Sequence, residues 1–165
     1  MSPARHLAVV LSAAVLFTAA SASAQTPPPP PAYGTPINLE QAKKAMAAAE
    51  AEARKNNWPV VIAILDTGGL LVMLQRLDNT QWGSIEVAKD KARSAVAFRR
   101  STKVFSDAIA QGGANMRLLN VTGASVIEGG VPVIVDGKII GAIGVSGVTS
   151  QQDAQVAQAG ADAVK

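Results

Sequence analysis

Residues 129–147 form two short apolar runs, GGVPVIV and KIIGAIGVSG, joined by the dipeptide Asp136-Gly137. An Asp-Gly pair between apolar runs is the strongest short-range pattern for a tight β-hairpin. A second pair of runs, VVIAILD and LLVMLQRL, flanks the turn DTGG and predicts another hairpin. Because the apolar residues are continuous and do not alternate with polar ones, both faces of the sheet must be covered, by helices or by a neighbouring subunit.

Alanine-rich stretches with apolar residues three or four positions apart lie before, between and after the hairpins. They predict amphipathic helices, which run from Asn38, over Gly83–Phe98, from about Ser101 to Gly112-Gly113, and from Ser150 onward. The segment 114–125 predicts a helical turn followed by loop. The sequence therefore predicts an α+β domain, in which helices pack on a central antiparallel sheet of about five strands to make an α/β sandwich.

Two of these helices begin with pairs of polar residues that predict N-terminal caps. Asn38 and Gln41 are spaced as in a capping box, and so are Ser150 and Asp153. Within the predicted helix Gly83–Phe98, the charged residues from Lys89 to Arg93 predict a solvated helix face.

The first 24 residues have the three parts of an export signal: a basic start, the apolar run LAVVLSAAVLFTAA, and ASA at Ala22 to Ala24. The apolar run is shorter than the ~20 residues that a membrane-spanning helix needs. We expect cleavage near Ala24 and a protein in the periplasm or secreted, with no membrane span. Residues 25–37 contain five consecutive prolines and predict a stiff linker. Residues 38–165 are then one domain.

The chain has no cysteine, and its single histidine, His6, lies in the predicted signal. This composition excludes a Ser-His-Asp or Cys-His hydrolase and the usual zinc sites from the mature chain. The formal charge of +3 falls by one when Arg5 is removed. Such a small charge gives no support to a nucleic-acid partner.

The stretch KIIGAIGVSGVTSQQD, residues 138–153, places three glycines at intervals of three before the last predicted helix. A phosphate-binding loop needs a lysine directly after its last glycine, but the next lysine after Gly147 is Lys165. A dinucleotide fingerprint needs different spacing and a βαβ unit. The pattern favours glycines at positions where another element approaches the strand closely, with phosphate binding as the alternative.

Three phrases together resemble the haem-binding, haem-degrading family named for GlcG and HbpS, over about Leu39 to Lys165. They are LDTGGLLVMLQRLD, GSIEVAKDKARSAVAFRRST and EGGVPVIVDGKIIGAIGVSGVTSQQDAQVAQAG. The resemblance implies a compact α/β sandwich that assembles into dimers and often octamers. It also implies haem or iron binding in several members, and peroxide-dependent haem breakdown in some of them. Such breakdown is chemistry of the bound haem, so no catalytic residue is assigned to the chain.

Candidate binding residues cluster after the predicted helix that ends at Phe98. The resemblance includes a threonine after F-x-x-[PS], and Thr102 in FRRST matches it as a weak haem ligand. Arg99, Arg100 and Lys103 are candidates for binding haem propionates or another carboxylate, since the guanidinium fork suits carboxylates. Solvation alone is the alternative for all three.

Methionine and tyrosine are the further haem ligands in common use, and Tyr33 is the single tyrosine of the chain. Met116, beside two glycines, is the candidate, with packing as the alternative, whereas Met46 and Met73 are predicted core residues. The metal-ligand set is unassigned. Asp78 and Glu128 lie at strand or loop ends, but neither has a partner that would define an acid–base pair.

Three hypotheses follow. The first is an exported haem- or iron-binding homo-oligomer that stores haem, scavenges haem or acts as the partner of a sensor protein. The second is a non-haem binding module for a small, glycolate-like carboxylate. The third is an oligomeric interaction scaffold.

Overall fold

The computed structural model describes residues 28–164, so the predicted signal peptide and the first linker residues lie outside the described residues. The elements follow one another in the order helix, hairpin, helices, hairpin, helix. They are α1 (Leu39–Lys55), β1 (Val61–Asp66), β2 (Leu71–Arg76), α2 (Ser84–Ala97), α3 (Lys103–Gln111), the 3₁₀ helix η1 (Gly113–Asn120), β3 (Gly130–Val135), β4 (Lys138–Ser146) and α4 (Ser150–Asp162). The predicted α+β class is confirmed.

The sheet has four antiparallel strands in the order β2-β1-β4-β3. Each predicted hairpin forms, and the two hairpins join through β1 and β4, where Ile64 lies opposite Ile143. The sequence predicted about five strands. The difference is small, since Tyr33 makes a single parallel bridge to Ile139 and no fifth strand follows from it.

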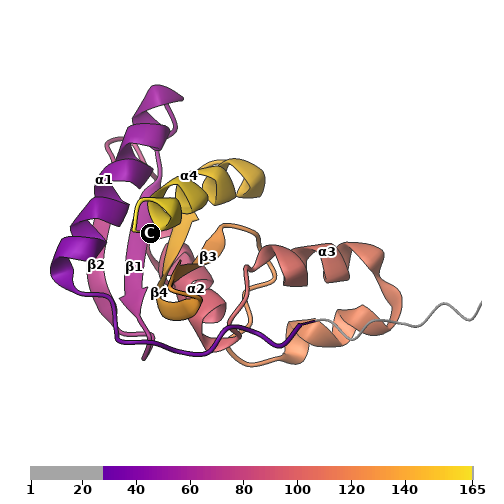
Figure 1. Ribbon diagram of the computed structural model, residues 1–165. Coiled ribbons are helices and arrows are strands. Elements are labelled where there is room, and N and C mark those ends of the chain that lie inside the picture. Colours follow the sequence, from indigo (N-terminus) through magenta and orange to yellow (C-terminus); the bar gives the residue numbers. More distant parts are fainter. Residues whose placement is uncertain (1–27, 165) are drawn as a thin grey trace, which may run out of the picture.

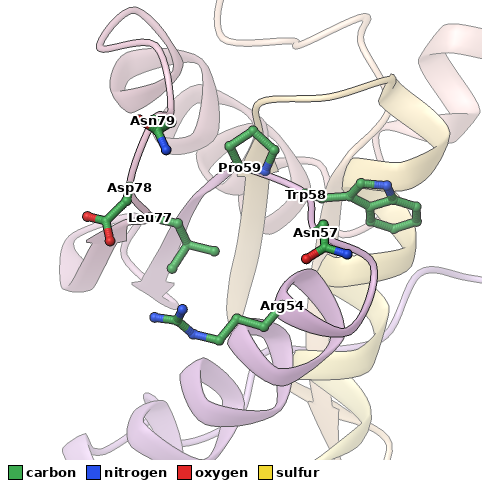
Figure 2. Close-up of a pocket in the computed structure, with 7 residues that line it drawn as sticks. All are labelled: Arg54, Asn57, Trp58, Pro59, Leu77, Asp78 and Asn79. Atoms are coloured by element: carbon green, nitrogen blue, oxygen red, sulfur yellow. The ribbon is translucent and has the colours of Figure 1, made fainter.

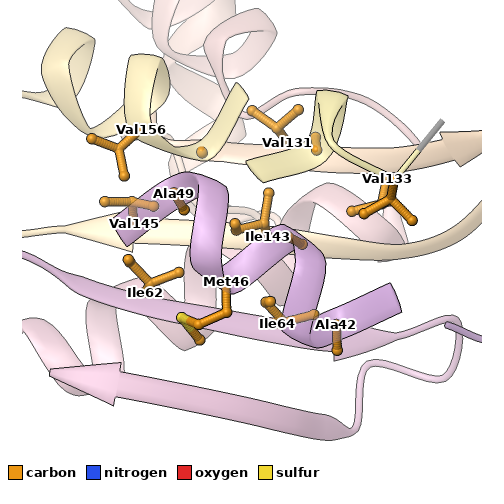
Figure 3. Close-up of a cluster of buried hydrophobic side chains, with 14 of the residues drawn as sticks. Ala42, Met46, Ala49, Ile62, Ile64, Val131, Val133, Ile143, Val145 and Val156 are labelled. Atoms are coloured by element: carbon orange, nitrogen blue, oxygen red, sulfur yellow. The ribbon is translucent and has the colours of Figure 1, made fainter. Parts of the chain in front are cut away.

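Helices cover both faces of the sheet, as the continuous apolar strands predicted. Figure 1 shows α1 and α4 on one face, and α2 packs against the other. The core under α1 and α4 is built from alternate residues of the strands, including Ile62, Ile64 and Ile143, against Met46 of α1 (Figure 3). β2 is an edge strand and stays partly exposed.

Glycines in β4 and directly after it serve close packing, which confirms the favoured interpretation of the glycine-rich stretch. A side chain at Gly144 would collide with the backbone of Ala88 and Ala92 in α2, and one at Gly147 would collide with the Pro59 backbone. The α2 backbone therefore lies directly on β4. This contact fixes the position of α2 on the sheet, and the candidate binding residues follow the end of that helix.

The caps of the first and last helices differ in their agreement with prediction. The Asn38 and Gln41 box is confirmed at α1. At α4 the prediction was wrong by one residue: Thr149 is the N-cap and forms the box with Gln152. Asp153 does not take part in this capping box, because its carboxylate points into the protein, where it binds Lys91.

The segment from Ala32 to Ile37 hydrogen-bonds along β4. Ile139 N donates to Ala32 O at 2.8 Å, Gly34 N donates to Ile139 O at 2.8 Å, and Ile37 N donates to Ile140 O at 2.7 Å. The chain after the prolines is therefore fastened to the sandwich, and it runs past the end of α2.

α3 and η1 pack on each other and extend away from the sheet as an arm (Figure 1). The helical turn predicted after Gly113 is confirmed as η1, and loop follows it. The arm exposes apolar side chains, among them Val104, Met116 and Leu119, which are 49%, 45% and 56% exposed.

Candidate functional site

The corner between α2 and α3 carries the predicted arginines. The end of α2 is closed by two hydrogen bonds, Arg100 N to Ala95 O and Arg99 N to Val96 O. This pair of bonds is a Schellman motif, which requires a left-handed residue just beyond the helix. Glycine usually occupies that position, but here Arg99 does, with φ of 54°.

Arg99 holds this unfavourable backbone while its side chain reaches the N-terminal segment. The other non-glycine residues with positive φ in the described chain are asparagines and an aspartate, which tolerate this region better. The Arg99 guanidinium carbon lies 5.7 Å from the centre of the Tyr33 ring, and Nη1 is 3.5 Å from Pro31 O. The Tyr33 hydroxyl donates to Val96 O at 2.7 Å. Strained non-glycine residues concentrate at functional sites.

Two adjoining hollows share Arg99 and Arg100. The first, of about 390 Å³, has an apolar wall from β3 and α4, and the second, of about 440 Å³, lies against Pro28 to Pro30 and Val104. The apolar wall consists of Val131, Pro132, Ile134 and Ala161, and the polar residues Ser101, Gln158 and Asp162 also line the first hollow. The arrangement places two guanidinium groups beside an apolar surface, which suits a ligand with an apolar body and carboxylate groups.

Thr102 follows the arginines but lies beneath the surface. Its side chain is 0% exposed. Gly130 N donates to the Thr102 hydroxyl oxygen at 2.9 Å, and Thr102 N donates to Gly130 O at 3.0 Å. The residue therefore ties the start of α3 to the start of β3, and its role as a haem ligand stays a prediction.

Lys103 and Met116 line neither hollow. Lys103 Nζ forms an ion pair with Asp107 of the same helix at 2.7 Å, and this hydrogen bond raises the pKa of the Lys103 ammonium. Met116 lies on η1 in the projecting arm. The structure thus brings Arg99 and Arg100 together and leaves Lys103 and Met116 outside the hollows that they line.

A buried ion pair beside this corner was missed by the sequence analysis. The prediction of a solvated face for Lys89 to Arg93 is wrong at Lys91, which is 1% exposed. Lys91 Nζ donates to Asp153 Oδ2 at 2.7 Å and to Val145 O at 2.9 Å. Helical spacing contained a sign of it, since Lys91 lies on the stripe of Ala88 and Ala92.

The position of Asp153 also argues against phosphate binding by the glycine-rich stretch. Its carboxylate accepts hydrogen bonds from the backbone N–H groups of Val148 and Gly147, at the start of α4. Burial raises the pKa of this carboxyl, and the hydrogen bond from Lys91 opposes that rise. An internal anion therefore already accepts hydrogen bonds from N–H groups of the glycine-rich stretch, just before α4.

Metal ligands do not gather in the described part of the chain: residues 28–164 contain no group of three or more histidine, cysteine, aspartate or glutamate side chains arranged to hold an ion. Within the same residues, no helix combines the length and the apolar character needed to cross a bilayer.

The fold and this corner define a class of small α+β sandwich domains with a cationic, apolar-walled surface site. The chain belongs to the family described as haem degrading protein HbpS-like, whose model matches residues 37–162. It is 45% identical to the protein GlcG of Escherichia coli K12 over 112 aligned residues. The alignment covers 67% of this chain and 81% of GlcG.

Two solved structures are similar throughout the fold. Klebsiella pneumoniae protein ORFY is 30% identical with a TM-score of 0.74, over 89% of this chain and 97% of that protein. The crystal structure of the PduOC:haem complex is 28% identical with a TM-score of 0.70, over 78% of this chain and 95% of that protein. The predicted family is confirmed.

Proposed function

We propose that this chain is an exported haem-binding protein that stores or scavenges haem or partners a sensor. The observation that carries the proposal is the pair of guanidinium groups, Arg99 and Arg100, beside the apolar wall of one hollow. Haem combines an apolar macrocycle with two propionates, and arginine binds carboxylates through two parallel hydrogen bonds. The family description and the haem complex of a similar protein support the same ligand.

The residues of the corner fit the propionates and the macrocycle better than they fit the iron. Thr102 would have to give up its hydrogen bond from Gly130 N to reach a ligand. Met116 lies on the arm, and residues 28–164 contain neither histidine nor cysteine. We infer that Arg99 and Arg100 hold the propionates and that Val131, Pro132 and Ile134 contact the ring. Bound haem would supply any iron chemistry, including its own breakdown by peroxide.

Titration of the mature chain with hemin tests this proposal. We expect a saturable Soret shift at micromolar concentration that weakens at least about tenfold in an Arg99→Gln/Arg100→Gln double variant, since each lost charge-assisted pair costs about 1 kcal/mol or more. An Arg76→Gln/Arg117→Gln variant removes the same charge away from both hollows and should titrate like the parent. Absence of any shift in the parent would refute haem binding.

The spectrum also separates modes of haem binding. A Thr102→Ser variant keeps the hydroxyl and Thr102→Val removes it. Equal spectra for both variants would support docking through the propionates, while a change limited to Thr102→Val in a folded protein would support the threonine as ligand.

A small carboxylate is the second candidate for the same corner, because the residues that line the two hollows with Arg99 and Arg100 include no histidine, cysteine, methionine or tyrosine. This proposal predicts that glycolate raises the melting temperature of the mature chain, since a ligand that binds only the native state stabilises it. The Arg99→Gln/Arg100→Gln variant should lose the effect. A thermal response to glycolate without a Soret response to hemin would favour this candidate.

The exposed apolar side chains of the α3–η1 arm support a homo-oligomer, as expected for the family, because such surfaces are normally covered. A Val104→Asp/Leu119→Asp variant should then have a lower mass than the parent in size-exclusion chromatography with light scattering. If the protein is exported, the intact mass of the secreted material should correspond to a chain whose first residue is near Gln25. Retained residues 1–24 would contradict export.

A further inference from the structure

A hollow of about 310 Å³ lies at the end of the sheet where α1 leads into β1 and β2 leads towards α2. Figure 2 shows its lining: Arg54, Asn57, Trp58 and Pro59 from the first connection, and Leu77, Asp78 and Asn79 from the second. Neither hollow of the α2–α3 corner shares a lining residue with it. It is a separate place on the protein.

Backbone hydrogen bonds fix both walls of this hollow. Trp58 N donates to Ala53 O, and Asn57 N donates to Arg54 O, with Asn57 left-handed at φ of 56°. These bonds form a second Schellman motif and hold the last turn of α1. On the other side, Leu77 N donates to Val60 O and the Thr80 hydroxyl donates to the same oxygen. The hollow is therefore pre-formed, with a buried Leu77 as its floor.

The hollow contains one cation and one anion that do not pair with each other. Arg54 uses Nε to bind Glu50 at 2.6 Å, and its terminal nitrogens make no hydrogen bond within residues 28–164. Over the same residues, the Asp78 carboxylate has neither a hydrogen bond nor an ion pair. In Figure 2 the guanidinium of Arg54 lies below Leu77 and the carboxylate of Asp78 lies to the left of it, and both residues line the hollow.

We propose that this hollow binds a small zwitterion, namely a free α-amino acid with a short apolar side chain. The ligand carboxylate would bind the terminal nitrogens of Arg54, in the two-bond geometry that guanidinium favours. Its ammonium would bind Asp78, and its side chain would lie on Leu77 and Pro59. A simple anion would be repelled by Asp78 and a simple cation by Arg54, so the pair of charges selects a ligand that carries both.

Affinity is expected in the millimolar range, because the Arg54 side chain is 64% exposed and exposed charge pairs are weakened by solvent. The hollow still discriminates through its two charges. Loss of either ligand charge, or of either protein charge, should weaken binding by about fivefold or more.

The test uses valine and two analogues that each lack one charge. Isovalerate is valine without the ammonium, and isobutylamine is valine without the carboxylate. Titrations of the mature chain, without hemin, are followed by the indole N–H resonance of Trp58 in heteronuclear NMR spectra. We expect a saturable shift with valine and at least about fivefold weaker responses with each analogue.

Variants of the two charged residues complete the test. Arg54→Gln and Asp78→Asn should each weaken the binding of valine by about fivefold or more. Both positions are exposed, so the fold should persist. Arg76→Gln and Asp136→Asn remove the same charges outside the hollow and should bind like the parent.

Three results would overturn the proposal: no saturation by valine at tens of millimolar, equal responses to all three ligands, or equal losses in the hollow and control variants. Each result is independent of the hemin titration, so the two proposals fail separately.

Discussion

Lys91→Met keeps an unbranched side chain that matches the apolar stem of lysine but removes the ammonium that Asp153 and the Val145 carbonyl bind. Removing one partner of a buried pair leaves an uncompensated charge and costs about 3–5 kcal/mol. Asp153 keeps its hydrogen bonds from Val148 and Gly147 and can take up a proton, so the lower end of that range applies. We expect the free energy of unfolding to fall by about 3 kcal/mol at pH 7.

A double variant separates loss of the pair from loss of packing. In Lys91→Met/Asp153→Asn the buried charge is gone, and the amide can still accept from Val148 N. Replacing both charges is often close to neutral. We expect this variant to recover about 1–2 kcal/mol relative to Lys91→Met. Lys89→Met removes a neighbouring, partly exposed lysine that pairs with Glu86 and should cost less than about 1 kcal/mol.

The stability of Lys91→Met relative to the parent should depend on pH, and the pKa of Asp153 gives the direction of that dependence. Burial raises the pKa of Asp153 above its ordinary value of 3.8, and Lys91 opposes the rise. In Lys91→Met that opposition is lost, so the folded state binds a proton at higher pH than the unfolded state does. Stability of the variant relative to the parent should therefore improve as pH falls from 7 through the raised pKa towards 3.8.

Urea unfolding followed by circular dichroism measures these differences, at one protein concentration because association would add to stability. Two results would refute the assignment of Lys91 and Asp153 as a coupled buried pair. One is a loss of unfolding free energy below about 1 kcal/mol in Lys91→Met. The other is a loss in the double variant that equals the sum of the losses in the two single variants.

Three further predictions concern the same corner and its packing. Thr102→Val should lower the free energy of unfolding by about 1–3 kcal/mol, because Gly130 N loses its buried acceptor, whereas Thr102→Ser should cost less; equal urea midpoints would contradict this. Gly144→Ala should cost about 2 kcal/mol or more in the same assay, because the new methyl group meets the α2 backbone; wild-type stability would count against the close contact. Arg99→Gly should leave thermal stability unchanged or raise it by up to about 1 kcal/mol while weakening hemin binding, because glycine accepts φ of 54° without strain; a clear loss of stability would show that the Tyr33 contact outweighs the strain.

Much of the fold could be predicted from local patterns. The Asp136-Gly137 pair defined one hairpin, and Asn38 with Gln41 defined the start of α1. The cap of α4 was predicted one residue late because Ser150 and Thr149 are chemically equivalent candidates. Only the course of the chain shows that the Asp153 carboxylate turns inward, which leaves Thr149 and Gln152 to cap the helix.

The candidate site was predictable only in part. The run Arg99 to Lys103 is visible as a cluster of cations, but Lys103 pairs with Asp107, while Arg99 and Arg100 line the hollows. Pro31 and Tyr33 were assigned to a linker, since nothing in that segment indicates that it lies against the end of α2.

The sequence by itself determined the hairpins, the helices and the family, because these depend on residues close together in the chain. The tertiary structure alone decided which polar side chains are buried and with what partners. Thr102 meets Gly130 across 28 residues, and Lys91 meets Asp153 across 62. Their environment arises only when α2, β4 and α4 pack together, since burial and charge pairing depend on distance in space.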